Sequence, residues 1–301
     1  MRFSPLGNSL RVLAPAKINL ALHVLGRRAD GYHDLQTLMV SIRLYDLLEF
    51  SPTTNTEVSL RLHGITESFQ AVPTDGRNLI CKAAGLLQSE TGCPRGASIL
   101  LRKSIPAEAG LGGGSSNAAA TLQGLNRFWD LNLGRDRLHE LASRLGSDVN
   151  FFLDSTPAAI CSGRGEKIAA VPLQRPLHVV IVKPASGLST ARVFQKWSEL
   201  QGSTVHADVK QRALAPLTVE DDRGAVRHHV VNDLEAPARI LNPEIDRVMK
   251  QFESQDLAGS GMTGSGSACF ALCHTARHAR VVAGRCRSGR LGRVYVVSSG
   301  I

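Results

Sequence analysis

The sequence of 301 residues is poor in aromatic side chains and has no long apolar run. Phe, Trp and Tyr make up 5% of the chain, so we expect its cores to be built from Leu, Val, Ile and Ala. No stretch reaches the roughly 18 consecutive apolar residues of a membrane span. The N-terminus also lacks the basic, apolar and small-residue pattern of a secretory signal. The sequence therefore predicts a soluble, cytoplasmic protein with no membrane partner.

The six cysteines include no Cys-x-x-Cys pair, which argues against a zinc site and favours free, buried thiols. Cys269 and Cys273 lie in an apolar segment that is typical of a buried strand. We assign no metal ligand to the protein from its sequence.

The net charge of +9 raises the possibility of a nucleic-acid partner. Much of the excess lies in residues 274–301, where six arginines meet no acidic residue. Aromatic residues do not alternate with these arginines, as they would in a protein that binds single strands. We therefore interpret this segment as a solvated surface and predict no nucleic-acid partner.

A glycine run lies near the middle of the chain, at residues 110–114, and is followed by Ser115 and Ser116. Glycine loses backbone entropy in regular structure, so such a run suits a loop that approaches a ligand closely. The serines are good N-cap residues, and apolar residues then recur at helical spacing as far as Trp129. A loop at a helix N-terminus is a binding site for phosphate. The alternative is a plain surface turn before a helix.

The two common phosphate motifs do not fit this run. A Walker A loop needs a lysine after its last glycine, where Ser115 stands, and a dinucleotide fingerprint needs a glycine at Ser115 itself. The segment 106–119 instead resembles the phosphate loop of the galactokinase, homoserine kinase, mevalonate kinase and phosphomevalonate kinase superfamily. Two further blocks, residues 15–20 and 262–267, are similar to its other motifs in the same order.

Three polar sites admit two interpretations on local sequence alone. Residues 10–25 alternate between apolar and polar side chains, and we interpret them as two strands interrupted at Pro15. Lys17 and Asn19 share one face of the second strand and either line a site or, as is common for a lysine in a strand, lie at a solvated edge of the sheet. Asp148 is either a turn residue or a base held in a loop before a strand. The pair at residues 32–33 either packs at an edge or offers a ring and an imidazole to a base.

The pattern predicts an α+β protein of two domains, residues 1–165 and 166–301, divided near the turn at residues 163–165. Helices are expected at residues 78–91, 117–129, 135–145, 190–200, 232–241, 243–255 and 276–287. Strands are expected at residues 35–50, 57–63, 97–103, 177–183, around 261, 268–274 and 293–298. The second half is compatible with an antiparallel sheet covered by helices on one face.

Within the superfamily, the chain most resembles the kinases that phosphorylate the 2-hydroxyl of a cytidine-diphosphate-linked methylerythritol in non-mevalonate isoprenoid synthesis. The resemblance rests on residues 30–37, 146–149, 163–166 and 232–235. It implies an N-terminal domain like ribosomal protein S5 domain 2, a ferredoxin-like C-terminal domain, and an active site between them. One departure is Asn150, which stands where a proline is common.

The same resemblance implies a role for each matching residue. Asp148 would accept the hydroxyl proton, and Lys17 would orient Asp148 and offset the charge of the phosphoryl group. Asn19 would contact the substrate near its hydroxyl, and residues 264–267 would close over the reacting phosphate. His33 would bind the cytosine edge, and the rings on either side of the base would be Tyr32 and Phe194.

ATP, with Mg²⁺ carried on it, is the implied cofactor, and Ser115 is the serine expected nearer the metal. The residues implied to hold the ATP phosphates are Pro106, Ala107, Glu108, Ala109, Gly110, Leu111, Gly112, Gly113, Gly114, Ser115 and Ser116.

Two alternatives remain. The first is a homoserine or mevalonate kinase of the same superfamily. The substrates of these kinases carry no nucleobase that Tyr32 and His33 could recognise. A non-catalytic protein that binds nucleic acid with the same fold would not need both Lys17 and Asp148. The protein is expected to be a monomer or a homodimer.

Overall fold

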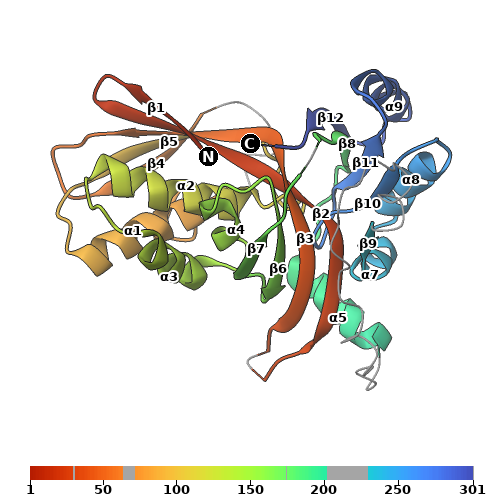
Figure 1. The fold of residues 1–301 in the computed structure, drawn as a ribbon, viewed down its shortest axis with the longest axis horizontal. Helices are drawn as coiled ribbons and strands as arrows, with labels where there is room; N and C mark the ends of the chain where they lie inside the picture. The colour runs from red at the N-terminus through yellow and green to blue at the C-terminus, as the bar shows by residue number, and fades with distance from the viewer. Residues whose placement is uncertain (30, 64–71, 174, 202–229, 301) are drawn as a thin grey trace.

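The structure is a computed structural model, and it describes residues 1–29, 31–63, 72–173, 175–201 and 230–300. In this part of the chain two β-sheets lie side by side, and helices cover each of them (Figure 1). The predicted α+β arrangement is confirmed. None of the described helices is long and apolar enough to span a membrane.

The first sheet is dominated by two strands of 19 residues each, β2 and β3. The strand order is β1-β2-β3-β5-β4, with β6 and β7 continuing from β3, and β9 pairing parallel to β2. Its strands are Arg2–Leu6 (β1), Ser9–Arg27 (β2), His33–Ser51 (β3), Val58–His63 (β4), Ala97–Arg102 (β5), Ala158–Gly163 (β6), Lys167–Ala170 (β7) and Val231–Asn232 (β9).

Pro15 lies inside β2, so the predicted break into two strands was wrong. A proline donates no ladder hydrogen bond, and β2 accommodates it with a shift in register against β3 between Pro15 and Ala16. Strand β7 belongs to the first sheet and extends it to Ala170, beyond the predicted domain boundary at residue 165. The boundary itself stays a prediction.

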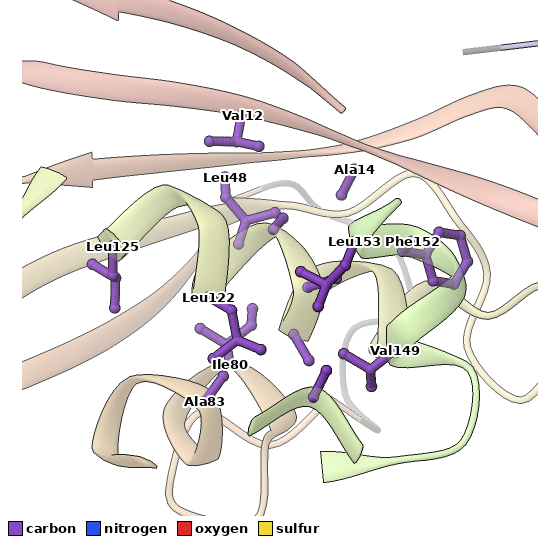
Figure 2. Close-up of a cluster of buried hydrophobic side chains, with 14 of the residues drawn as sticks. Val12, Ala14, Leu48, Ile80, Ala83, Leu122, Leu125, Val149, Phe152 and Leu153 are labelled. Carbon is purple, nitrogen blue, oxygen red and sulfur yellow. The ribbon is translucent and has the colours of Figure 1, made fainter. Parts of the chain in front are cut away.

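Four helices pack on one face of the first sheet: Leu79–Thr91 (α1), Gly113–Phe128 (α2), Arg135–Leu145 (α3) and Val149–Leu153 (α4) (Figure 1). Figure 2 shows Val12 and Leu48 of the sheet above α2, and Leu122 of α2 pointing towards α1. Val149 and Phe152 enter the same cluster from α4. Aliphatic side chains dominate this core, as the low aromatic content predicts.

The second sheet is antiparallel, with the strand order β10-β11-β8-β12. Its strands are His178–Lys183 (β8), Gly259–Met262 (β10), Cys269–Cys273 (β11) and Arg293–Ser298 (β12). Its helices are Thr190–Gln201 (α5), Glu235–Leu241 (α7), Pro243–Glu253 (α8) and Ala276–Ser288 (α9). The helix predicted from Asn232 begins at Glu235, because Val231 and Asn232 pair with β2.

Side chains on alternate positions of β8 enter two different cores. Val180 and Val182 pack among the helices of the second sheet, whereas Val179 and Ile181 join a cluster with Ile18 of the first sheet. Both faces of the second sheet are therefore buried, and the contact between the two sheets is apolar. The candidate site lies beside this contact.

Candidate active site

Helix α2 begins at Gly113, inside the glycine run, rather than after the serines. Gly112 is its N-cap residue and has a φ of +70°, a left-handed conformation that glycine adopts without strain. No side chain caps this end, so the N–H groups of the first turn have no intrahelical acceptor. The prediction that Ser115 or Ser116 is the cap was wrong, and the predicted helix N-terminus is confirmed.

The loop before α2 passes close to both sheets and has no room for side chains at its glycines. A Cβ on Gly112 would lie 2.9 Å from Phe152 and 3.0 Å from Cγ of Lys17. A Cβ on Gly110, where φ is +72°, would collide with the backbone carbonyl of Thr263. Glycine at these positions therefore lets the loop contact α4, β2 and the second sheet at once.

Two cavities meet at this loop. The outer cavity, of about 350 Å³, is lined by residues 106–115 together with Lys103 and residues at and before the N-terminus of α1. The inner cavity, of about 520 Å³, lies between β2 and β3 of the first sheet and the segments 188–194 and 264–266 of the second half, and it contains Lys17, Asp148 and Phe194 in its wall. Glu108, Gly110 and Gly112 line both cavities.

Lys17 and Asp148 come together in the wall of the inner cavity. Nζ of Lys17 lies 3.5 Å from Oδ2 of Asp148 and donates a hydrogen bond of 2.6 Å to Oδ1 of Asn19. The Lys17 side chain is 4% exposed, and that of Asp148 is 28% exposed. A buried cation and a reachable carboxylate therefore stand side by side. Asp148 is the N-cap residue of helix α4, so the strand that one of the two interpretations placed after it was wrong.

Asn19 is held on three sides. Its Nδ2 donates to Oγ1 of Thr37 at 2.7 Å, and its backbone N–H donates to Oγ1 of Thr263 at 3.0 Å. Oγ1 of Thr263 also lies 3.1 Å from the carbonyl of Gly110. The hydroxyl of Thr263, directly after β10, thus contacts both the predicted substrate residue and the glycine loop.

The two serines of the loop differ in exposure. Ser115 is half-buried and lines the outer cavity, whereas Ser116 is fully buried and its Oγ lacks a hydrogen-bond partner. Among the described residues, no cluster of three or more His, Cys, Asp or Glu side chains could hold a metal ion.

The structure brings His33 onto Phe194, with the ring centroids 4.8 Å apart and the planes at 24°. Trp197 meets His33 edge-on at 5.6 Å. Tyr32 is 56% exposed, and the guanidinium of Arg164 lies 5.2 Å from its ring centre. Burial lowers the pKa of His33, and the nearby Arg27 charge lowers it further. The predicted sandwich of a base between Tyr32 and Phe194 stays a prediction, and Asp30 lies outside the described residues.

Comparison with known proteins agrees with this geometry. Residues 78–163 match the model of the GHMP kinases N terminal domain, and residues 214–289 match that of the GHMP kinases C terminal domain. The chain is 41% identical over 268 residues to a 4-diphosphocytidyl-2-C-methyl-D-erythritol kinase of Bacillus cytotoxicus, covering 88% of each chain. It is 42% identical to the protein of that name from Acidovorax ebreus, covering 86% of each. The chain belongs to the GHMP kinases. Among them, it lies with the 4-diphosphocytidyl-2-C-methyl-D-erythritol kinases.

Solved structures support the fold of this GHMP kinase. A crystal structure of 4-(cytidine 5'-diphospho)-2C-methyl-D-erythritol kinase superposes with a TM-score of 0.75 at 35% identity, covering 97% of this chain and 99% of that one. A homoserine kinase from Cytophaga hutchinsonii has a TM-score of 0.73 at 17% identity, covering 100% of this chain and 98% of that one, and shows the fold alone. The predicted S5 domain 2-like and ferredoxin-like domains are confirmed.

Several residues of this GHMP kinase site were missed from the sequence. Trp197 gave no signal that separates it from a surface residue. Thr37, Arg164 and Asn232 did give a signal, because each lies in a block that carried the family resemblance, but no role was assigned to them. Nδ2 of Asn232 donates to the carbonyls of Met262 at 2.8 Å and of Gly264 at 2.9 Å, so it fixes the turn beside the loop.

Proposed function

We propose that this GHMP kinase transfers the γ-phosphate of ATP to the 2-hydroxyl of 4-diphosphocytidyl-2-C-methyl-D-erythritol. The observation that carries the proposal is the pair of Lys17 and Asp148, 3.5 Å apart where the two cavities meet at the glycine loop. The outer cavity would hold the nucleotide, and the inner cavity the acceptor alcohol. The similarity to the named kinases supports this choice of acceptor.

The residues of the outer cavity fit a polyphosphate. The first turn of α2 offers backbone N–H groups that have no intrahelical acceptor. Lys103 adds a buried cation, whose side chain is 9% exposed and whose Nζ lies 2.7 Å from Oδ2 of Asp46. Ser115 lies where its hydroxyl could contact Mg²⁺ carried with ATP, and the buried Ser116 would support the loop instead. Mg²⁺ would supply neutralisation of charge on the phosphates.

Asp148 would accept the proton of the attacking hydroxyl, because its exposed edge faces the inner cavity. Lys17 would hold the Asp148 carboxylate in place and offset negative charge on the phosphoryl group during transfer. Asn19 would orient the hydroxyl. Since the side-chain amide of Asn19 donates to Thr37 and accepts from Lys17, it would keep one orientation throughout.

The cytidine end of the substrate would lie near His33 and Phe194. For a base to enter between Tyr32 and Phe194, the His33 ring would turn away from Phe194 and meet the base edge. Arg164 and Lys17 are the cations among the residues that line the inner cavity. Because Lys17 is engaged by Asp148, we assign the diphosphate of the substrate to Arg164.

The test is release of ADP by the purified protein with Mg-ATP, offered 4-diphosphocytidyl-2-C-methyl-D-erythritol beside mevalonate, homoserine and galactose. Turnover confined to the cytidylylated alcohol is the expected result. Turnover on another alcohol would overturn the cytidine assignment and keep the roles of Lys17 and Asp148. Silence on all four would overturn the proposed function. We further propose that the enzyme is cytoplasmic, acts as a monomer or homodimer, and does not bind nucleic acid.

A further inference from the structure

The helix that carries Asp148 at its N-terminus is very short. Helix α4 spans five residues, Val149–Leu153, and a helix of this length has little stability of its own. Its position depends on neighbouring elements. Phe151 and Phe152 anchor its apolar side in the core, and its polar side, at Asn150 and Asp154, faces the helix α3.

A single side chain of α3 contacts both ends of α4. Nδ1 of His139 lies 2.9 Å from Oδ1 of Asn150, and Nε2 lies 2.8 Å from Oδ1 of Asp154. Asn150 is buried, and the His139 side chain is 23% exposed. Ser143, one turn further along α3, binds the other side of the Asn150 amide at 2.7 Å.

The network continues into the backbone of α3. The Ser143 hydroxyl donates to the carbonyl of His139 at 2.9 Å. His139, Ser143 and Asn150 therefore form one connected set of hydrogen bonds between α3 and α4.

We infer that His139 is a positioning residue that fixes α4 through Asn150 and Asp154 and thereby holds Asp148 in its reacting position. The role in the reaction rests on the proposed function. His139 does not touch the reacting atoms. A proline at residue 150 would restrain the first turn of α4 without a partner on α3.

Asn150 depends on His139 more than Asp154 does, because Asp154 also accepts hydrogen bonds from Arg135 at 2.7 and 3.0 Å. Without the ring nitrogens of His139, α4 would be loosened at Asn150, two residues after Asp148. The inference therefore predicts that loss of these nitrogens lowers kcat.

The experiment compares the full-length protein with His139→Phe, Asn150→Pro and the double variant. His139→Phe keeps the ring and removes both hydrogen bonds, and Asn150→Pro removes the amide that His139 binds. Pro is tolerated in the first turn of a helix. Arg137→Gln is the matched control, since Arg137 ties α3 to Glu90 of α1 and not to α4.

We expect His139→Phe to lower kcat by about 10- to 100-fold with an unchanged KM for ATP, as a misplacement of about 1 Å would. The double variant should recover most of the lost kcat, because proline at residue 150 restrains α4 without His139. Arg137→Gln should keep wild-type kcat. Wild-type kcat in His139→Phe, or no recovery in the double variant, would overturn the inference.

A readout without turnover separates this inference from the proposed function. Amide hydrogen exchange in residues 149–153 should be faster in His139→Phe than in the wild type and in Arg137→Gln. Unchanged exchange in His139→Phe would overturn the inference even in an active enzyme. If His139→Phe does not fold, Asn150→Ala, which removes the amide that His139 contacts, decides: wild-type kcat and wild-type exchange in that variant would overturn the inference. A wild type without turnover would instead refute the proposed function.

Discussion

Replacing Asp148 with Asn removes the proposed proton acceptor while keeping the shape of the side chain. Removal of a general base costs about 10²- to 10⁴-fold in rate, so we expect kcat to fall within that range. The Kd for ATP should not change, because Asp148 lines the inner cavity and the nucleotide would bind in the outer one. The amide oxygen can still accept a hydrogen bond from Lys17.

The structure also sets the expected change in stability. The Asp148 side chain is 28% exposed and lies 3.5 Å from Nζ of Lys17, so water screens the pair in part. Lys17 keeps its bond of 2.6 Å to Asn19 in the variant. The free energy of unfolding should therefore fall by only about 1 kcal/mol, a shift in Tm of about 2–4 °C.

The assay is steady-state release of ADP, with ATP binding measured by calorimetry and Tm by thermal unfolding on the same samples. Lys17→Met serves as the comparison, and the double variant should be little slower than the worse single one, because residues that act as a unit are not additive. A kcat for Asp148→Asn near that of the wild type would refute the base assignment. A large loss of ATP binding would refute the division of the site into two cavities.

Three further changes test the rest of the site. Gly110→Ala should abolish most turnover and lower Tm in thermal unfolding, because its Cβ would displace the carbonyl of Thr263. Arg164→Gln should raise the KM for the cytidylylated alcohol by about tenfold and leave the KM for ATP unchanged in initial-rate assays. Burial, with a contribution from the Arg27 charge, lowers the pKa of His33 from its ordinary value of 6.5. The KM for the cytidylylated alcohol should therefore rise as the pH falls, with the midpoint of the rise below pH 6.5. Phe194→Ala should raise that KM at every pH, with kcat nearly preserved.

Periodicity alone predicted most helices and strands of the described chain. Arg135–Leu145 and Arg293–Ser298 have the expected bounds, because each combines a clear apolar period with a glycine or turn at its end. The short elements were missed or mistaken. Five residues such as Val149–Leu153 carry too little of a 3.6-residue period to separate a helix from a strand, and packing among helices decides between them.

The candidate site could be predicted only in part from the sequence, for a different reason. The glycine run predicts an anion site from local sequence, because glycine and the helix N-terminus bind anions through the nearby backbone. Lys17 and Asp148 carry no such local sign, and their contact depends on how β2 and α4 are packed. Family resemblance named the pair, and the 3.5 Å distance in the structure supports it. The stacking of His33 on Phe194 joins two segments that no spacing in the sequence relates.

The hydroxyl of Thr263 connects the second half of the chain to two parts of the candidate site. It accepts the N–H of Asn19 at 3.0 Å, and it faces two further acceptors, Oδ1 of Asn19 at 3.2 Å and the carbonyl of Gly110 at 3.1 Å. With one hydrogen for two acceptors, Thr263 joins β2 and the glycine loop at a single point. Any shift of the second sheet would therefore move the loop and Asn19 together, and with them the alignment of phosphate and hydroxyl across the wall that the two cavities share.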